Sequence, residues 1–205
     1  MSLVTYDGLI AAIPGWASNS ALSAHYDDFI AWAHQEINRR LRANVMLTAA
    51  NLTINAETIS APTGFLAMKR LYLDVTPREQ VAVTSIAEVN TLAAERRSVQ
   101  YPTHVTSEGS LLHFAPVFTG SPTGKALYYK SVTVPSDDNA TNVVMAAYPY
   151  LYLHGTLEAL FNYQEDDNMA DRHGQKFGAL IEDINARDAA DIVSGPSSRR
   201  VRGFN

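Results

Sequence analysis

The hydrophobic residues of this 205-residue chain change their spacing twice, and these changes constrain its fold more than any other feature. Over residues 24–43, apolar side chains recur every three or four positions, as on one face of an α-helix. From about Thr48 to Pro135 they alternate with polar residues, which is typical of β-strands. After residue 138 the helical spacing returns and continues to Val193. The pattern predicts an α+β protein, with a helical body interrupted by one β-rich insertion.

The helical stretches have recognisable ends. Thr5 can cap a short first helix, Tyr6–Ile13, and we expect Pro14 to end it because proline disfavours helical geometry in the residue before it. After the insertion, the apolar residues predict one helix that starts near Pro149 and a second that runs from about Asp166 to Val193. We expect these last two helices to form an antiparallel hairpin.

Turn residues divide the insertion into short strands. The segments 61–64 (APTG) and 120–124 (GSPTG) are rich in residues that break strands, and Gly109 can take the positive φ of a hairpin turn. Residues 85–88 (SIAE) form a capping box, in which the serine and glutamate side chains each accept from a free amide, so they predict one short helix. The chain thus divides into the N-terminal helices of the helical body (1–47), a β-rich insertion with one short helix (48–137), the C-terminal helical hairpin (138–193) and a flexible basic tail (194–205).

The composition argues against several classes of function. The chain has no cysteine, which excludes disulfides, thiolate nucleophiles and zinc sites built on cysteine. A net charge of −5 argues against a general nucleic-acid coat, and no apolar stretch approaches the roughly 18–20 residues that span a membrane. Gly120 to Lys125 lacks the spacing and the following Ser or Thr of a phosphate loop. With no nucleophile beside a matching base, we predict no enzyme and no cofactor.

The densest acidic cluster follows the first helix of the C-terminal pair. Its i, i+4 carboxylates, Asp167 and Asp171, can in principle bind a divalent ion or act as acid and base. Carboxylates at a helix start also cap free amides and face the positive end of the helix dipole, which is the interpretation we prefer. The cluster consists of Glu165, Asp166, Asp167 and Asp171.

The histidines also predict no metal site. His25 and His34 are nine positions apart on one predicted helix, so they point to opposite sides. His104 and His113 fall on the two arms of the predicted hairpin, but the neighbouring carboxylate, Glu108, is expected to be directed away by the turn. Two imidazoles without a third ligand do not make a zinc site.

The C-terminal segment 194–205 combines Gly, Pro, Ser and three arginines and has no periodic apolar face. Its two large apolar residues can anchor it to a partner or a neighbouring subunit, while its arginines pair with carboxylates. Phosphate contact with DNA and a solvated extension without a role are the alternatives. The candidate contact residues are Arg199, Arg200, Val201, Arg202 and Phe204.

Four stretches together resemble a known family, the head–tail adaptor (connector) proteins of tailed podovirus and siphovirus bacteriophages. They are residues 29–42 (FIAWAHQEINRRLR), 61–66 (APTGFL), 126–130 (ALYYK, then Val134-Pro135) and 142–155 (NVVMAAYPYLYLHG). The second stretch has Thr63-Gly64 where the family frequently has an acidic residue. Each stretch alone is a weak match to the family, and their order along the chain is more specific for it.

The resemblance implies a fold and a structural role. Members have a helical body with a β-sandwich or barrel-like insertion, and they form a ring, commonly of twelve subunits, under the portal. The ring forms part of the DNA channel, through which DNA passes without sequence-specific binding, and it offers a platform to the tail or nozzle protein. The expected location is the head–tail neck of the virion, after synthesis in the host cytoplasm, and the expected partners of residues 199–204 are the portal or a neighbouring subunit.

Charge fits a channel role for the acidic cluster. Residues 158–191 hold nine acidic and three basic residues, net −6, whereas residues 194–205 have net charge +3. An acidic lining repels phosphate and lets DNA slide, although an acidic helix face can also serve solubility alone.

Two other functions remain open at this point. One is another neck or tail component of the same build, such as a tail terminator or a nozzle-proximal protein. The other is a ligand-binding module that uses tyrosines of the β insertion, namely Tyr101, Tyr128 and Tyr129.

Overall fold

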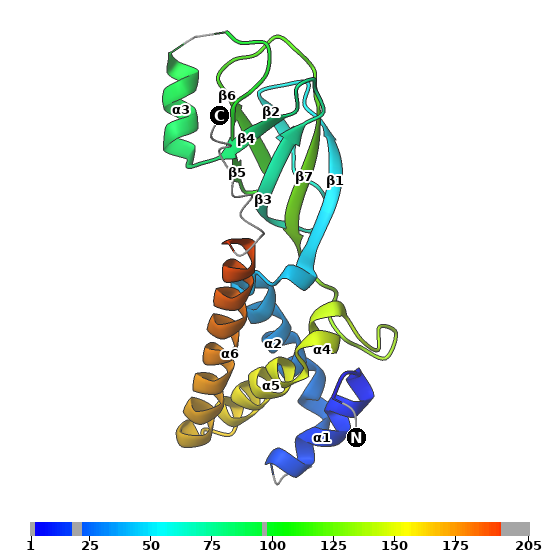
Figure 1. Ribbon diagram of the computed structural model, residues 1–205. Coiled ribbons are helices and arrows are strands. Elements are labelled where there is room, and N and C mark those ends of the chain that lie inside the picture. The colour runs from blue at the N-terminus through cyan, green and yellow to red at the C-terminus, as the bar shows by residue number, and fades with distance from the viewer. Residues whose placement is uncertain (1–2, 18–21, 96–97, 194–205) are drawn as a thin grey trace, which may run out of the picture. The chain divides into compact units, whose positions relative to one another are not determined.

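The computed structural model describes residues 3–17, 22–95 and 98–193, and the chain divides into two compact units. One unit, of residues 1–44 and 133–205, is helical, and the other, of residues 45–132, is built on a β-sheet (Figure 1). The predicted α+β class is confirmed. After the sheet, the chain rejoins the helical unit at residue 133. There the carbonyl of Thr133 accepts a hydrogen bond from Asn142 Nδ2 at 2.8 Å.

The helical unit centres on α5, which contacts α1, α2, α4 and α6. At Gly155 the helices α2 and α5 come so close that a Cβ atom there would lie 2.9 Å from Cβ of Ala33. Apolar residues face the neighbouring helices from nearly every turn of α5, so it is the core helix of the unit. The elements are α1 (Tyr6–Ala17), η1 (Ser23–His25), α2 (Tyr26–Arg40), α4 (Val143–Ala147), α5 (Pro149–Tyr163) and α6 (Asp167–Val193).

The first helix does not end where the sequence predicts. Thr5 caps α1 as expected, since its Oγ1 accepts from the amide of Gly8 at 3.2 Å. Pro14 lies inside α1, which continues to Ala17. The last turn is kept because Ala17 is buried and the Trp16 ring packs edge-on against two buried imidazoles, and such packing can offset the hydrogen bond that proline removes.

The β unit is one seven-stranded sheet in the order β1-β7-β3-β4-β5-β6-β2. Neighbouring strands are antiparallel except β4 and β5, which are parallel. Its elements are η2 (Asn44–Met46), β1 (Leu47–Thr53), β2 (Thr58–Ser60), β3 (Phe65–Leu73), β4 (Glu79–Val83), α3 (Ile86–Ala94), β5 (His104–Glu108), β6 (Leu111–Ala115) and β7 (Thr123–Lys130).

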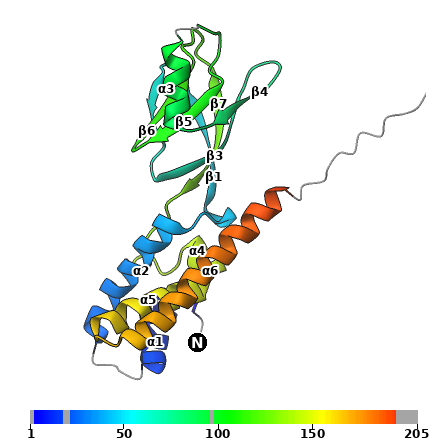
Figure 2. The ribbon, with the colours of Figure 1, turned by 90° about the vertical axis from the view of Figure 1, so that its left-hand side faces the viewer.

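Helix α3 makes the parallel pairing possible, since parallel neighbours need a crossover connection. It follows β4, precedes β5 and packs on β5 and β6 (Figure 2). The predicted capping box is half right: Ser85 Oγ accepts from the amide of Glu88 at 3.3 Å, but the Glu88 carboxylate accepts from the hydroxyl of Thr84.

The sheet curls around a single core (Figure 1). Leu52 of β1, Leu73 of β3 and Leu112 of β6 belong to one buried cluster, although β1 and β6 are far apart in the strand order. Among the described strands, the end strands β1 and β2 do not pair with each other, so the predicted sandwich or barrel-like insertion is an open curled sheet.

Candidate functional site

The acidic cluster predicted from the sequence lies at the turn from α5 to α6. All four of its carboxylates, Glu165, Asp166, Asp167 and Asp171, are exposed there. Asp166 Oδ1 accepts from the amide of Met169 at 3.1 Å, so this residue caps α6 as expected. Within the described residues, no three His, Cys, Asp or Glu side chains gather as a metal site. We call these four residues the acidic corner.

An exposed aromatic residue adjoins the acidic corner. Tyr163, in the last turn of α5, is 57% exposed, and its ring lies 5.6 Å from that of Phe29 and 5.4 Å from that of His25. Three other exposed aromatic side chains, Trp16, Trp32 and Tyr150, lie on the same helical unit. Tyrosine and tryptophan are enriched at protein–protein interfaces, so these exposed side chains are typical of a surface that binds another protein.

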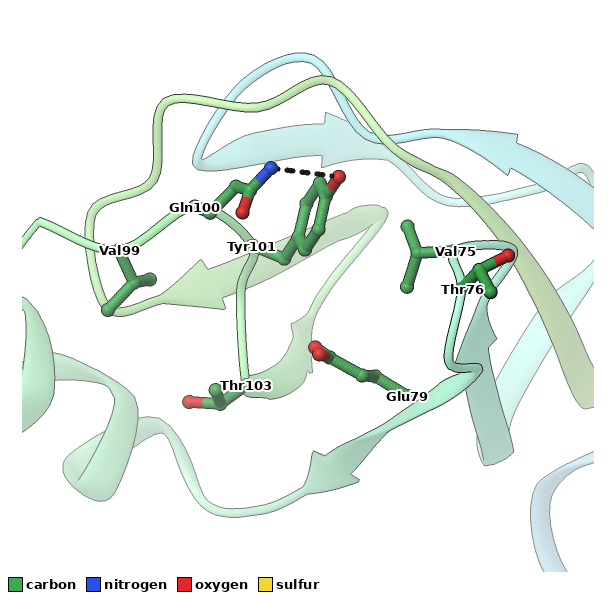
Figure 3. Close-up of a pocket in the computed structure, with 7 residues that line it drawn as sticks. All are labelled: Val75, Thr76, Glu79, Val99, Gln100, Tyr101 and Thr103. Atoms are coloured by element: carbon green, nitrogen blue, oxygen red, sulfur yellow. Dashed lines mark hydrogen bonds between the residues drawn. The ribbon is translucent and has the colours of Figure 1, made fainter.

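The tyrosines proposed for a ligand-binding module do not form one site. Tyr128 is buried in the sheet core and stacks on Phe65 at 5.5 Å between ring centroids, so it is inaccessible to a ligand. The ring of Tyr129 lies 5.4 Å from Lys69 Nζ. Tyr101 lines a pocket of about 380 Å³, where it accepts a hydrogen bond from Gln100 (Figure 3).

A pair of buried histidines was missed by sequence reasoning. His154 of α5 and His173 of α6 have their Nδ1 atoms 3.0 Å apart. The Trp16 ring packs edge-on against both imidazoles, and Phe161 stacks on His173 at 5.5 Å. Burial, and after it the neighbouring His173 and Lys176, lower the pKa of His154 to about 4. Burial also lowers the pKa of His173, so both imidazoles are neutral at pH 7.

The histidines of the predicted hairpin each have a carboxylate neighbour. His104 Nε2 lies 4.0 Å from Glu88, and His113 Nε2 lies 3.6 Å from Glu108. The expectation that the turn directs Glu108 away is therefore wrong. In the β5–β6 register Thr106 is opposite His113, and Glu108, two residues further on, shares its face of the sheet.

Polar side chains fix the two chain segments that join the helical unit to its insertion. Asn185 of α6 donates to the carbonyl of Arg40 and accepts from the amide of Arg42, and Asp188 accepts from the amide of Asn44. These bonds satisfy backbone groups at the end of α2 and in the residues just beyond it.

The returning segment is fixed by a buried network. The Tyr152 hydroxyl lies 2.9 Å from His34 Nδ1 and accepts from Asn142 Nδ2, which also reaches the carbonyl of Thr133. Burial raises the pKa of Tyr152, which keeps this hydroxyl protonated. Both entry and exit of the insertion are thus held by side chains of the helical unit.

The predicted contact residues of the C-terminal segment lie outside the described residues. They are Arg199, Arg200, Val201, Arg202 and Phe204.

Comparison with known proteins identifies one relationship. A family model described as SU10 adaptor protein matches residues 4–202, which is nearly the whole chain and includes both units. A comparison with curated protein sequences finds no match. None of the described helices is both long and apolar enough to cross a membrane.

Proposed function

Because the chain belongs to the SU10 adaptor protein family, a phage head–tail adaptor family, we propose that it docks as a ring under the portal. There it forms part of the DNA channel and provides the platform for the tail or nozzle protein. The observation that carries this proposal is the family match over residues 4–202. The role is structural and requires no catalysis.

A ring needs two different surfaces on each subunit. A heterologous contact repeated by rotation closes into a ring when one surface of each copy meets another surface of the next. The helical unit and the β unit differ in architecture, and the helical unit exposes Trp16, Trp32, Tyr150 and Tyr163. Twelve copies is the number that the family resemblance implies.

The acidic corner is proposed to face the DNA channel or an interface. Its carboxylates are exposed, and no basic side chain forms an ion pair with them in the described residues. Negative charge at the channel wall repels phosphate, so DNA slides past without binding.

Mixing the purified protein with purified portal tests the ring. We expect native mass spectrometry to find monomers or weak associations in the isolated protein, and electron microscopy to find a closed ring on the portal. Single asymmetric copies at the neck would refute the ring. A ring that forms on tail tubes and not on the portal would instead support a tail terminator or nozzle-proximal protein.

Removing the residues after Val193 tests the role of the C-terminal segment. We propose that Val201 and Phe204 anchor it on the portal or a neighbouring subunit, and that its arginines pair with carboxylates there. The truncated protein should keep nearly the same melting temperature but lose portal binding, so that full heads without tails accumulate. Portal binding at the full-length level by the truncated protein would show that the segment is dispensable.

A change of the three arginines alone separates portal contact from DNA contact. Substitution of Arg199, Arg200 and Arg202 by glutamine should weaken portal binding in a pull-down assay. If it weakens only binding to free DNA, the segment contacts phosphate instead.

A further inference from the structure

One edge of the curled sheet is open along a whole strand. β1 is an end strand, and among the described strands it pairs with β7 alone, in a register without a bulge. Ile54, directly after β1, donates its amide to the carbonyl of Pro122, directly before β7. Because backbone groups of successive strand residues point to alternate sides, Thr48, Ala50 and Leu52 bond to β7. The residues whose amides and carbonyls point away from the sheet are then Leu47, Ala49, Asn51 and Thr53.

This edge has none of the usual protection. The outward backbone groups have no partner in the described part of the chain, and Ala49, Asn51 and Thr53 are exposed. Native proteins protect free edges with charged side chains, proline, a bulge or a very short strand. The other end strand, β2, has only three residues, but β1 has seven, LTAANLT, and none of them is charged or proline. β1 can therefore accept another strand.

The free edge of β1 is complementary to itself. In an antiparallel pair centred on Ala50, Leu47 lies opposite Thr53 of the second copy. Ala49 lies opposite Asn51 in the same register, so all four outward residues exchange two hydrogen bonds with the residue opposite. A two-fold contact brings identical strands together, and like charges opposite each other would repel. An uncharged strand with a small residue at its centre avoids both repulsion and crowding.

We propose that β1 pairs with β1 of a second copy, antiparallel and about a two-fold axis at Ala50, so that the two sheets become continuous. One pair of short strands buries little area, so the contact is weak and depends on concentration. It is isologous, whereas the contacts of a ring are heterologous. The two contacts are therefore different, and this one does not rest on the adaptor role.

Single cysteines in the isolated full-length protein test this pairing. The chain has no cysteine, so each variant has one thiol per copy. In the proposed pair, position 50 lies opposite itself with about 4.5 Å between the Cα atoms, which is within the range for a disulfide. The variant is Ala50→Cys, and the matched control is Ala49→Cys. Two cysteines at position 49 would have Cα atoms about 8–9 Å apart, which is too far for a disulfide.

Exposure alone favours the control. Ala49 is exposed and Ala50 is half-buried, so random collisions between copies would cross-link position 49 more readily. We expect the reverse: under mild oxidation the covalent dimer forms at least about tenfold faster from Ala50→Cys, which corresponds to about 1.4 kcal/mol. In analytical ultracentrifugation the native chain should show a dimer whose fraction rises with protein concentration.

A second substitution removes the pairing but keeps the sheet. The amide of Asn51 points away from β7, so Asn51→Pro deletes a donor of the free edge and no bond to β7. Asn51→Lys keeps the backbone, adds a charge to the edge and gives the same test if proline destabilises the sheet. In the Ala50→Cys background, Asn51→Lys should slow dimer formation to the rate of Ala49→Cys. The melting temperature of the reduced protein should stay nearly the same.

Three outcomes would overturn the proposal. They are equal or faster cross-linking at position 49, an unchanged rate at position 50 after Asn51→Lys, and a native chain that stays monomeric at every concentration. In the last case the edge of β1 is free for a strand of another protein. Because the assay contains no portal, its result is independent of the adaptor role.

Discussion

Replacing Phe177 by alanine is expected to lower the free energy of unfolding of the helical unit by about 3–5 kcal/mol. Phe177 of α6 is 1% exposed and lies where three helices meet. Its ring borders Gly155 of α5, where a Cβ atom would be 3.1 Å away, and the Arg40 guanidinium of α2 lies 6.0 Å from the ring centroid. Because α2 and α5 are already in close contact at Gly155, the helices cannot move together to fill the cavity.

Urea denaturation followed by far-ultraviolet circular dichroism measures this loss. The matched control is Tyr163→Ala, which removes an aromatic ring of similar size from a site that is 57% exposed and should cost less than about 1 kcal/mol. If both variants lose the same small amount of stability, the junction of α2, α5 and α6 does not depend on the Phe177 ring.

The order of helices and strands follows from the sequence because burial imposes a different period on each. The alternation of Leu71 and Leu73 with polar neighbours gives β3, and the spacing of apolar residues in 24–43 gives α2. Local rules also locate the caps at Thr5, Ser85 and Asp166, since a cap depends on residues only three positions away.

The sequence-based predictions fail where tertiary contacts determine the end of a helix or the pairing of strands. Pro14 would end an isolated helix, but the packing of Trp16 and Ala17 keeps the last turn of α1. The strand order includes a parallel β4–β5 pairing across α3, which the period of either strand does not encode. A strand's alternation identifies its buried face but not its neighbour.

In the candidate site, too, some residues could be predicted from the sequence and others could not. The acidic corner is readable because its residues are adjacent in the sequence. His154 and His173 are 19 residues apart, and their contact depends on how α5 and α6 align across the turn at residues 164–166. Spacing within either helix carries no signal for it.

Acidification is expected to destabilise the helical unit through the buried histidine pair. His154 has a pKa of about 4 in the folded protein and an ordinary value of 6.5 when unfolded. Below pH 6.5 the unfolded chain therefore binds a proton that the folded chain does not, so stability falls as the pH falls. From pH 7.5 to pH 5.0, His154 alone should remove about 2 kcal/mol, and His173 acts in the same direction.

One neighbouring carboxyl works against this loss. Burial raises the pKa of Glu158, one turn after His154 on α5, so the folded protein takes up its proton first and gains stability as the pH falls. A comparison of variants with the native chain separates the two effects. In His154→Phe the loss between pH 7.5 and pH 5.0 should shrink by about 2 kcal/mol, whereas His25→Gln, which changes an exposed imidazole, should keep the native pH dependence.

Trp16 makes the same event visible spectroscopically, because its ring packs edge-on against both imidazoles. The chain has two tryptophans, so Trp32→Phe leaves Trp16 as the only indole fluorophore. If charging the pair loosens the contact between α1 and α5, Trp16 emission should change below pH 5, before the sheet unfolds. A native pH dependence of stability in His154→Phe, with Trp16 emission constant until global unfolding, would show that the histidine pair does not cause the acid sensitivity. Loss of both signals in His154→Phe and neither in His25→Gln would assign the acid sensitivity of the helical unit to this single contact.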